Sequence, residues 1–132
     1  MSEAEEEVSI SAQTDKGEYT VGEKVRASIV FQNIGSNPIK LNFNSAQRYE
    51  FILLKEDEEV WRWSRNKMFA MVLESLVLKP KEKRIYTEAL ETAGMPPGSY
   101  DLVGIITSRP PRKATCRFTI RPSQPIEATK KI

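Results

Sequence analysis

Apolar and polar residues alternate along most of this chain with a period close to two residues. Every second position is apolar in residues 25–31, and the same spacing recurs in residues 8–12, 39–43 and 116–120. Side chains two positions apart lie on the same side of a β-strand. The pattern therefore predicts strands that turn one face to a core and the other face to water.

Turn-forming residues separate these strands. Two further runs, 49–54 and 100–106, are apolar at successive positions, which predicts central strands or strands whose second face meets a partner. Glycine, proline and acidic residues mark the connections, at Gly17, Gly22, 35–38, 56–59, 79–80, 95–98 and 109–112. We therefore expect an all-β fold, an immunoglobulin-like antiparallel β-sandwich of two packed sheets.

Two local patterns give more detailed expectations. Pro97-Gly98 predicts a type II turn, and Tyr100 after it predicts the tyrosine corner of immunoglobulin-like sandwiches. Residues 68–78 have the propensity for a short helix. Because strands surround this stretch, we expect an extended segment, a turn near Glu74-Ser75, and a strand that ends before Pro80.

The chain has 132 residues, which predicts one domain. We place the sandwich at residues 8–121, between an acidic N-terminal segment at 1–7 and a flexible C-terminal tail at 122–132. No apolar run is long enough to cross a membrane, and the first residues lack the pattern of a signal peptide. These features predict a cytoplasmic protein with no membrane partner.

Missing residue types exclude several kinds of chemistry. The chain contains no histidine, and Cys116 is its single cysteine. Histidine-based triads, zinc sites and an internal disulfide are therefore excluded. Ser64 and Lys67 have the S-x-x-K spacing of some serine enzymes, but the companion boxes S-D-N and K-T-G are absent. We expect no catalytic residue, no cofactor and no metal, hence not an enzyme.

The charge balance adds a constraint on partners. A net charge of +2 is too small to predict binding to nucleic acid. Trp61 and Trp63 are two residues apart, so we expect them on one face of a strand. Two interpretations stay open at this point: a pair of core residues, or an aromatic patch that docks a partner.

The most specific sequence strings resemble a known family. They are Gln-Arg-Tyr-Glu-Phe at 47–51, Val-Trp-Arg-Trp-Ser at 60–64, Phe69, Leu-Lys-Pro-Lys-Glu at 78–82 and Pro-Gly-Ser-Tyr at 97–100. Together they resemble the BsuPI-type intracellular proteinase inhibitor domain, over about residues 24–121. Glu50 stands where the family has aspartate, which keeps the charge. Lys81 stands at the usual turn glycine, which points to a different turn conformation.

The resemblance implies an immunoglobulin-like sandwich that inhibits a cytoplasmic, subtilisin-like serine protease through a surface loop. Such a loop must be held in its bound shape beforehand, and without a disulfide only proline, packing and hydrogen bonds can hold it. The candidate protease-binding residues are Ser64, Arg65, Asn66, Lys67 and Met68 in one loop, and Arg109, Pro110, Pro111 and Arg112 in another.

A third candidate loop is 92–97. Met68 would suit an apolar specificity pocket, and Arg109 or Arg112 an acidic one. We rank the 64–68 loop first, because its neighbours carry the family strings. The alternative function is a non-inhibitory interaction or structural module, which would recruit its partner through the Trp61/Trp63 patch or a sheet edge.

Overall fold

The computed structural model describes residues 7–123 of the chain. Residues 1–6 of the predicted acidic segment and 124–132 of the predicted tail lie outside the described residues. Within the described part, ten strands and one short 3-10 helix follow one another: β1 (Val8–Thr14), β2 (Glu18–Thr20), β3 (Val25–Asn33), β4 (Ile39–Phe43), β5 (Tyr49–Lys55), β6 (Glu58–Arg62), η1 (Trp63–Asn66), β7 (Glu74–Leu78), β8 (Lys83–Leu90), β9 (Gly98–Ile106) and β10 (Arg112–Arg121).

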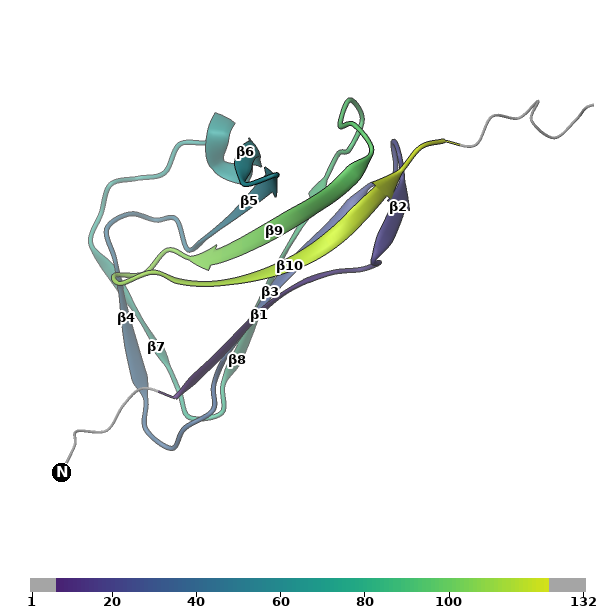
Figure 1. Cartoon of the computed structure of the whole chain (residues 1–132). Helices are drawn as coiled ribbons and strands as arrows, with labels where there is room; N and C mark the ends of the chain where they lie inside the picture. The colour runs from purple at the N-terminus through teal and green to yellow at the C-terminus, as the bar shows by residue number, and fades with distance from the viewer. Residues whose placement is uncertain (1–6, 124–132) are drawn as a thin grey trace, which may run out of the picture.

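The strands form two sheets and a ribbon. The larger sheet has the order β2-β10-β9-β5-β6, the smaller one the order β1-β3-β8, and β4 pairs with β7 in a separate two-stranded ribbon. In Figure 1 the larger sheet lies across the top of the view, the smaller one runs beneath it, and the ribbon closes the left side. The described pairs are antiparallel except β2 with β10. The predicted all-β sandwich is confirmed, with the ribbon as an addition.

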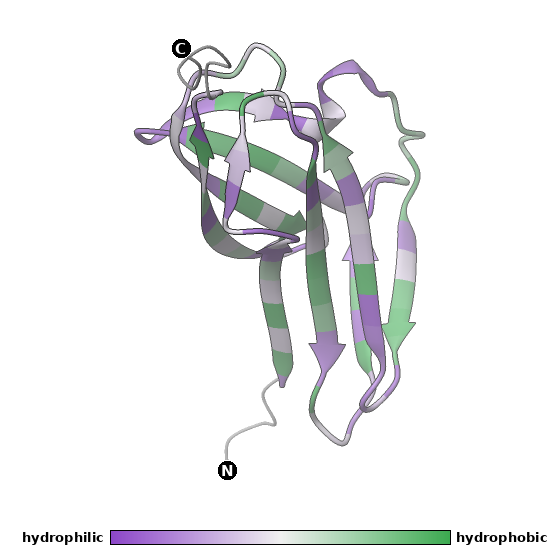
Figure 2. Ribbon diagram, turned by 90° about the vertical axis from the view of Figure 1, so that its right-hand side faces the viewer, coloured by the Kyte–Doolittle hydropathy of each residue, from purple (hydrophilic) through white to green (hydrophobic). Residues whose placement is uncertain are grey.

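The predicted alternation sets which side chains form the core. Val25, Ala27, Ile29 and Phe31 on β3 are all at most 1% exposed. Figure 2 shows the same alternation as bands of hydrophilic and hydrophobic colour along the strands. Residues 50–53 of β5 are buried in succession, so both faces of the strand are covered, as its mostly apolar run predicts. Hydrophobic burial between the two layers therefore holds the fold together without a disulfide.

A buried amide lies where the chain passes from the smaller sheet to the ribbon. Asn33 is fully buried at the end of β3, and its Nδ2 donates to the carbonyl oxygens of Asn37, at 2.8 Å, and Leu78, at 3.0 Å. Its Oδ1 accepts a hydrogen bond from the Gly35 amide at 2.9 Å. The Asn33 side chain thus provides hydrogen-bond partners for backbone carbonyl and amide groups at this bend, where strand-to-strand hydrogen bonds are interrupted.

Tyr100 forms the predicted tyrosine corner. Its ring is 1% exposed, and its hydroxyl donates to the carbonyl oxygen of Pro96 at 2.5 Å. The turn predicted at Pro97-Gly98 is wrong. The hydrogen-bonded turn lies earlier, with the Met95 amide 2.9 Å from the Thr92 carbonyl oxygen, because Gly94 supplies the positive φ (+87°).

The turn that leads into β8 keeps the conformation that glycine favours. Lys81 has a φ of +68°, so the expected change in turn conformation is not observed. The turn is closed by the Glu82 amide, 2.9 Å from the Lys79 carbonyl oxygen. The Glu82 carboxylate accepts from the Lys79 amide at 2.8 Å, and this hydrogen bond lowers the pKa of Glu82. These hydrogen bonds hold Lys81 in a left-handed backbone conformation that is unfavourable for any residue other than glycine.

The stretch 67–73 has no regular secondary structure, in agreement with the extended segment expected from the sequence. The turn predicted near Glu74-Ser75 is wrong, because β7 already begins at Glu74, opposite Phe43 on β4.

Among the described residues, no helix has the length and apolar character that a membrane crossing requires.

Candidate functional site

Two of the three candidate loops lie at the same end of the larger sheet. Ile106, the last residue of β9, pairs with the first residues of both β5 and β10, Tyr49 and Arg112. Strand β6 runs back to this end, where Arg62 pairs with Ile52. In Figure 1 the β9–β10 loop lies at the left, and the chain that leaves η1 at the top also runs to the left.

The third candidate loop, residues 92–97, precedes Gly98 and so lies at the opposite end of β9. A strand of this length separates its two ends by about 30 Å. One partner surface can contact the loops at 64–68 and 109–112 together, whereas the loop at 92–97 faces another direction.

A buried carboxylate fixes the first loop to the sheet. Glu50 on β5 is 3% exposed, and its oxygens accept hydrogen bonds from the amides of Phe51, at 3.0 Å, and Ser64, at 3.1 Å. The Ser64 hydroxyl donates to the same carboxylate, and Arg62 Nη1 lies 3.3 Å from it. A buried carboxylate is stable only when donors pair with it, so the hydrogen bonds fix Ser64 and Arg62 against Glu50 on β5. The family strings at 47–51 and 60–64 therefore meet in one polar cluster.

The outer side of this cluster carries further ion pairs. Glu59 Oε1 lies 2.9 Å from Arg62 Nη2, and its Oε2 lies 3.2 Å from Arg65 Nη2. The hydrogen bond from Arg62 lowers the pKa of Glu59, and that from Glu59 raises the pKa of Arg62. Arg65 is therefore paired at the surface of the cluster rather than projecting freely into solvent.

The two tryptophans do not share a strand face. Strand β6 ends at Arg62, so Trp63 is the first residue of η1, and the expectation of a common strand face is wrong. Just after this point, the amide and the hydroxyl of Ser64, in η1, donate to the Glu50 carboxylate. Trp61 lies opposite Leu53, and both tryptophans are partly buried against the core. A docking role for Trp61 and Trp63 stays a prediction.

A stack of aromatic rings connects the first loop to both sheets. The Tyr49 ring lies between Tyr86, with ring centroids 4.6 Å apart, and Trp63, at 4.8 Å, both stacked at 26°. Phe69 packs against Trp63 with the rings tilted by 42° and their centroids 5.9 Å apart, and Lys67 Nζ lies 4.8 Å from the centre of the same tryptophan ring. Phe69, just after the candidate loop, is thus anchored by aromatic packing.

The stack contains a hydroxyl that is also fixed. Tyr49 Oη donates to the Glu88 carboxylate at 2.5 Å. Burial, and then this hydrogen bond to a carboxylate, raise the pKa of Tyr49. Tyr49, whose ring stacks on Trp63, is therefore fixed both by ring stacking and by the hydrogen bond of its hydroxyl.

The stretch from 67 to 73, which we call the 67–73 segment, includes the anchored Phe69 but exposes its other apolar side chains. Met68 is 96% exposed, Met71 82% and Leu73 86%. Midway along it, the Ala70 carbonyl oxygen accepts a hydrogen bond from the Ala46 amide at 2.9 Å. Large apolar side chains gathered at the surface of an otherwise polar protein mark a contact site.

The second candidate loop is fixed by backbone hydrogen bonds. Arg109, Pro110 and Pro111 are exposed, and the peptide bond between Arg109 and Pro110 is cis. The Arg109 amide donates to the Asn42 carbonyl oxygen at 2.8 Å. Buried Ser108 donates its hydroxyl to the Pro110 carbonyl oxygen, also at 2.8 Å. The loop is thereby tied to the end of β4.

The two arginines of this loop differ. Arg112 is the first residue of β10 and is half-buried, and burial lowers the pKa of its guanidinium. Arg109 is exposed at the loop tip. Of the two, Arg109 is the one positioned to meet a partner.

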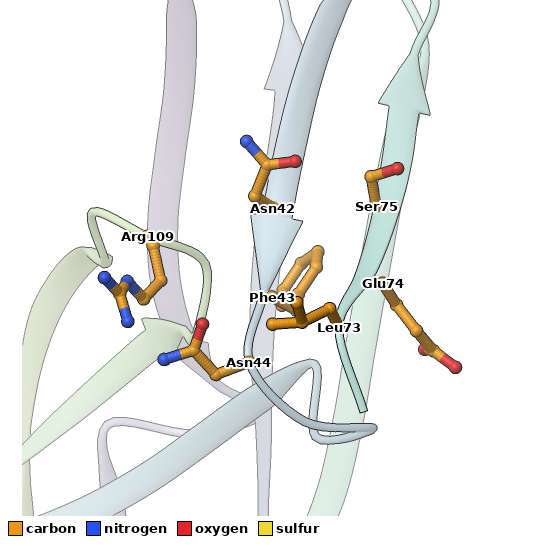
Figure 3. Close-up of a pocket in the computed structure, with 7 residues that line it drawn as sticks. All are labelled: Asn42, Phe43, Asn44, Leu73, Glu74, Ser75 and Arg109. Carbon is orange, nitrogen blue, oxygen red and sulfur yellow. The ribbon is translucent and has the colours of Figure 1, made fainter. Parts of the chain in front are cut away.

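A pocket of about 440 Å³ lies between the two regions. It is lined by Asn42, Phe43, Asn44, Leu73, Glu74, Ser75 and Arg109. In Figure 3, Arg109 and Asn44 approach each other on one side, and Leu73 lies over Phe43 on the other. The pocket thus joins the end of the 67–73 segment to the tip of the second loop.

Sequence reasoning identified Met68 and Arg109 but missed the pocket and most of the 67–73 segment. The segment does have a sequence signal, because residues 68–73 are uniformly apolar between two polar stretches. The pocket has none, since Asn42 and Asn44 read only as the polar positions of an alternating strand.

In the part of the chain from 7 to 123, no three His, Cys, Asp or Glu side chains are grouped so that they could hold a metal ion. Cys116 is half-buried, and burial raises the pKa of its thiol, which disfavours the reactive thiolate. The arrangement presents shape and charge for recognition.

Comparison with protein families gives a match over most of the chain. The BsuPI family, described as intracellular proteinase inhibitor, matches residues 12–111. Among curated proteins, none matches this chain.

Several solved structures share the fold. The sporulation control protein Spo0M of Bacillus subtilis has a TM-score of 0.54 and 14% identity, over 90% of this chain and 50% of that one. The CARDB domain of PF1109 from Pyrococcus furiosus, in complex with di-metal ions, has a TM-score of 0.53 and 11% identity, over 90% of this chain and 96% of that one.

The fold also matches parts of larger proteins. The β-glucosidase EmGH1 of Erythrobacter marinus has a TM-score of 0.53 and 11% identity, over 88% of this chain but 16% of that one. The DNA glycosylase AlkC of Pseudomonas fluorescens has a TM-score of 0.53 and 14% identity, over 88% of this chain and 31% of that one. Identities this low show a common fold and nothing about activity.

Proposed function

This chain belongs to the BsuPI family of intracellular proteinase inhibitors, and from that premise we propose that it inhibits a cytoplasmic, subtilisin-like serine protease. The inhibitory element is the 67–73 segment, which enters the substrate cleft of the protease. The family match over 12–111 also supports a single domain at 8–121.

One observation carries the proposal: an extended apolar stretch is exposed yet held at several points. Met68 is 96% exposed. Before it, Ser64 is bonded to buried Glu50, and after it Phe69 packs on Trp63. A segment fixed in this way loses little conformational entropy when it binds, and this is what tight inhibition without a disulfide requires.

The binding mode that fits this geometry is strand addition. The backbone of the 67–73 segment pairs with an edge strand of the protease, and alternate side chains enter pockets. Met68 fills an apolar specificity pocket, and Arg65, Asn66 and Lys67 contact the rim before it. An inhibitor of this kind acts by binding and is not an enzyme.

The same anchors should also make the segment resistant to cleavage. The bond after Met68 lies between two held residues, Ser64 on one side and Phe69 on the other. If the protease cuts this bond, the anchors keep the two new ends close together, so that rejoining competes with release.

An inhibition assay tests the proposal. The purified chain is incubated with several subtilisin-like intracellular proteases, and hydrolysis of a peptide substrate is followed. We expect inhibition by the wild-type chain and a loss of affinity of about 30-fold or more for Met68→Asp, the size of a hot-spot loss.

Ile85→Asp is the matched control, because Ile85 is a 57% exposed apolar residue on β8, outside the segment. It should inhibit like the wild-type chain. No inhibition by the wild-type chain at micromolar excess, or equal inhibition by Met68→Asp, would contradict the proposal.

A non-inhibitory interaction module is the second candidate function. The observation that favours it is the occurrence of the same fold as 16% of a β-glucosidase and 31% of a DNA glycosylase. Recovery of a partner that is not a protease, lost on substitution of Trp63 but kept in Met68→Asp, would support this candidate.

A further inference from the structure

The pocket between the two loops is polar where it opens. Residues 42 and 75 are paired across the β4–β7 ribbon, so Asn42 and Ser75 lie on the same face of it. Asn44 and Leu73, which flank the two strands just outside their ends, also line the pocket. Arg109 reaches it from the β9–β10 loop, whose backbone is tied to Asn42.

The Arg109 side of this opening carries a positive charge. Among residues 7–123, no ion pair or hydrogen bond engages the Arg109 guanidinium. The lining contains one carboxylate, Glu74, and it forms an ion pair with Arg48. Figure 3 shows the Glu74 side chain directed away from Arg109. The arginine therefore faces the pocket without a neutralising neighbour inside it.

These groups match the chemistry of a carboxylate. A guanidinium offers two parallel N–H donors to the two oxygens of a carboxylate. The side-chain amides of Asn42 and Asn44 add further donors at the same opening, and Ser75 adds a hydroxyl. A pocket of about 440 Å³ has room for one such side chain.

The position of the pocket indicates which molecule supplies the carboxylate that would bind there. Leu73 is both the last residue of the 67–73 segment and part of the pocket wall. A protease that holds this segment in its cleft must cover the pocket with its own surface. We infer that the pocket formed by Arg109, Asn42 and Asn44 binds an aspartate or glutamate of the target protease beside its substrate cleft.

This inference rests on the proposed function and gives the second candidate loop a separate task. The 67–73 segment occupies the cleft, and Arg109 makes a second contact outside it. Two contacts fix the orientation of the inhibitor as well as its position. An arginine–carboxylate contact also discriminates among proteases, because a target with a neutral or basic residue at this place loses the contact.

Charge reversal tests the inference in a protease that the wild-type chain inhibits. Arg109→Glu should weaken inhibition about tenfold or more, and Arg109→Lys should weaken it less, because lysine keeps the charge but loses the paired donors. Inhibition by the wild-type chain should weaken with added salt more steeply than inhibition by Arg109→Glu.

Arg121→Glu is the matched control. It makes the same change in net charge at the opposite end of β10, where Arg121 is likewise exposed. It should stay within about twofold of the wild-type chain, since a rim charge far from the contact has little effect. Thermal unfolding of each variant verifies that it is folded.

The outcomes separate the two proposals. If the wild-type chain inhibits and Arg109→Glu inhibits equally well, or loses no more than Arg121→Glu, the pocket does not bind a carboxylate, and the proposed function stands. If the wild-type chain inhibits no tested protease, the proposed function fails and this inference fails with it.

Discussion

Replacing Glu50 tests whether the buried carboxylate holds the first loop in place. Glu50→Ala removes the acceptor of the Phe51 amide, the Ser64 amide and the Ser64 hydroxyl, and it removes one partner of Arg62. Each buried donor left without an acceptor costs about 1–3 kcal/mol. Arg62 keeps its pair with Glu59, so the loss there is smaller.

These contributions do not simply add, because Ser64 is only half-buried and water can replace part of what it loses. We expect Glu50→Ala to lower the free energy of unfolding by about 3–5 kcal/mol, as for other buried charges that lose or leave a partner. Glu50→Gln keeps the shape and one acceptor oxygen, so it should cost about 1–2 kcal/mol.

Urea unfolding followed by tryptophan fluorescence measures both variants, because Trp61 and Trp63 flank the cluster. Inhibition of a target protease should fall as well, since the 67–73 segment loses its anchor at Ser64. Glu59→Ala is the control: it removes a carboxylate at the surface of the same cluster and should have a much smaller effect. A change within about 0.5 kcal/mol for Glu50→Ala would refute the argument.

Three further predictions concern the fold. Gly104→Ala should lower the free energy of unfolding by about 1–3 kcal/mol in thermal denaturation, because the new Cβ would lie 2.6 Å from Ile29 Cγ1; an unchanged midpoint would contradict this packing. Lys81→Gly should raise stability by about 0.5–1 kcal/mol, since Lys81 has a φ of +68°, and a loss measured by urea unfolding would count against it. Burial, and then the hydrogen bond to Asp15, raise the pKa of Tyr19 from 10.0 to about 12. The tyrosine therefore ionises at lower pH in the unfolded chain than in the folded one, so its contribution to the free energy of unfolding is full below pH 10 and is lost towards pH 12. Tyr19→Phe should make this loss shallower in unfolding curves measured across that range.

The fold was predictable because its pattern is repeated. Strands at 25–31 and 39–43 show the alternation that burial of one face imposes, and an error at one position leaves the pattern intact. The tyrosine corner at Tyr100 was predictable for a similar reason, since a local spacing places the hydroxyl over the preceding backbone. The turn before it was misplaced, because both Gly94 and Gly98 can supply a positive φ, and sequence does not select between them.

The candidate site was predicted only in part. Met68 and Arg109 were singled out, but as alternatives in separate loops. Trp63 was expected on the face of Trp61, but β6 ends at Arg62, and the next residues form a helix whose Ser64 donates to Glu50 on β5. Local propensity cannot report a partner that is far away along the chain.

The sequence alone determined the fold class, the family and the exclusion of histidine-based chemistry. The alternation of apolar and polar residues, the family motifs and the residue types present can all be read without knowing which segments meet in space. Only the tertiary structure decided that Glu50 holds Ser64 and that Leu73 and Arg109 line one pocket. Which loops meet at one end of a sheet depends on strand pairing between distant segments, and that pairing is set by the burial of the whole core rather than by any residues within the loops.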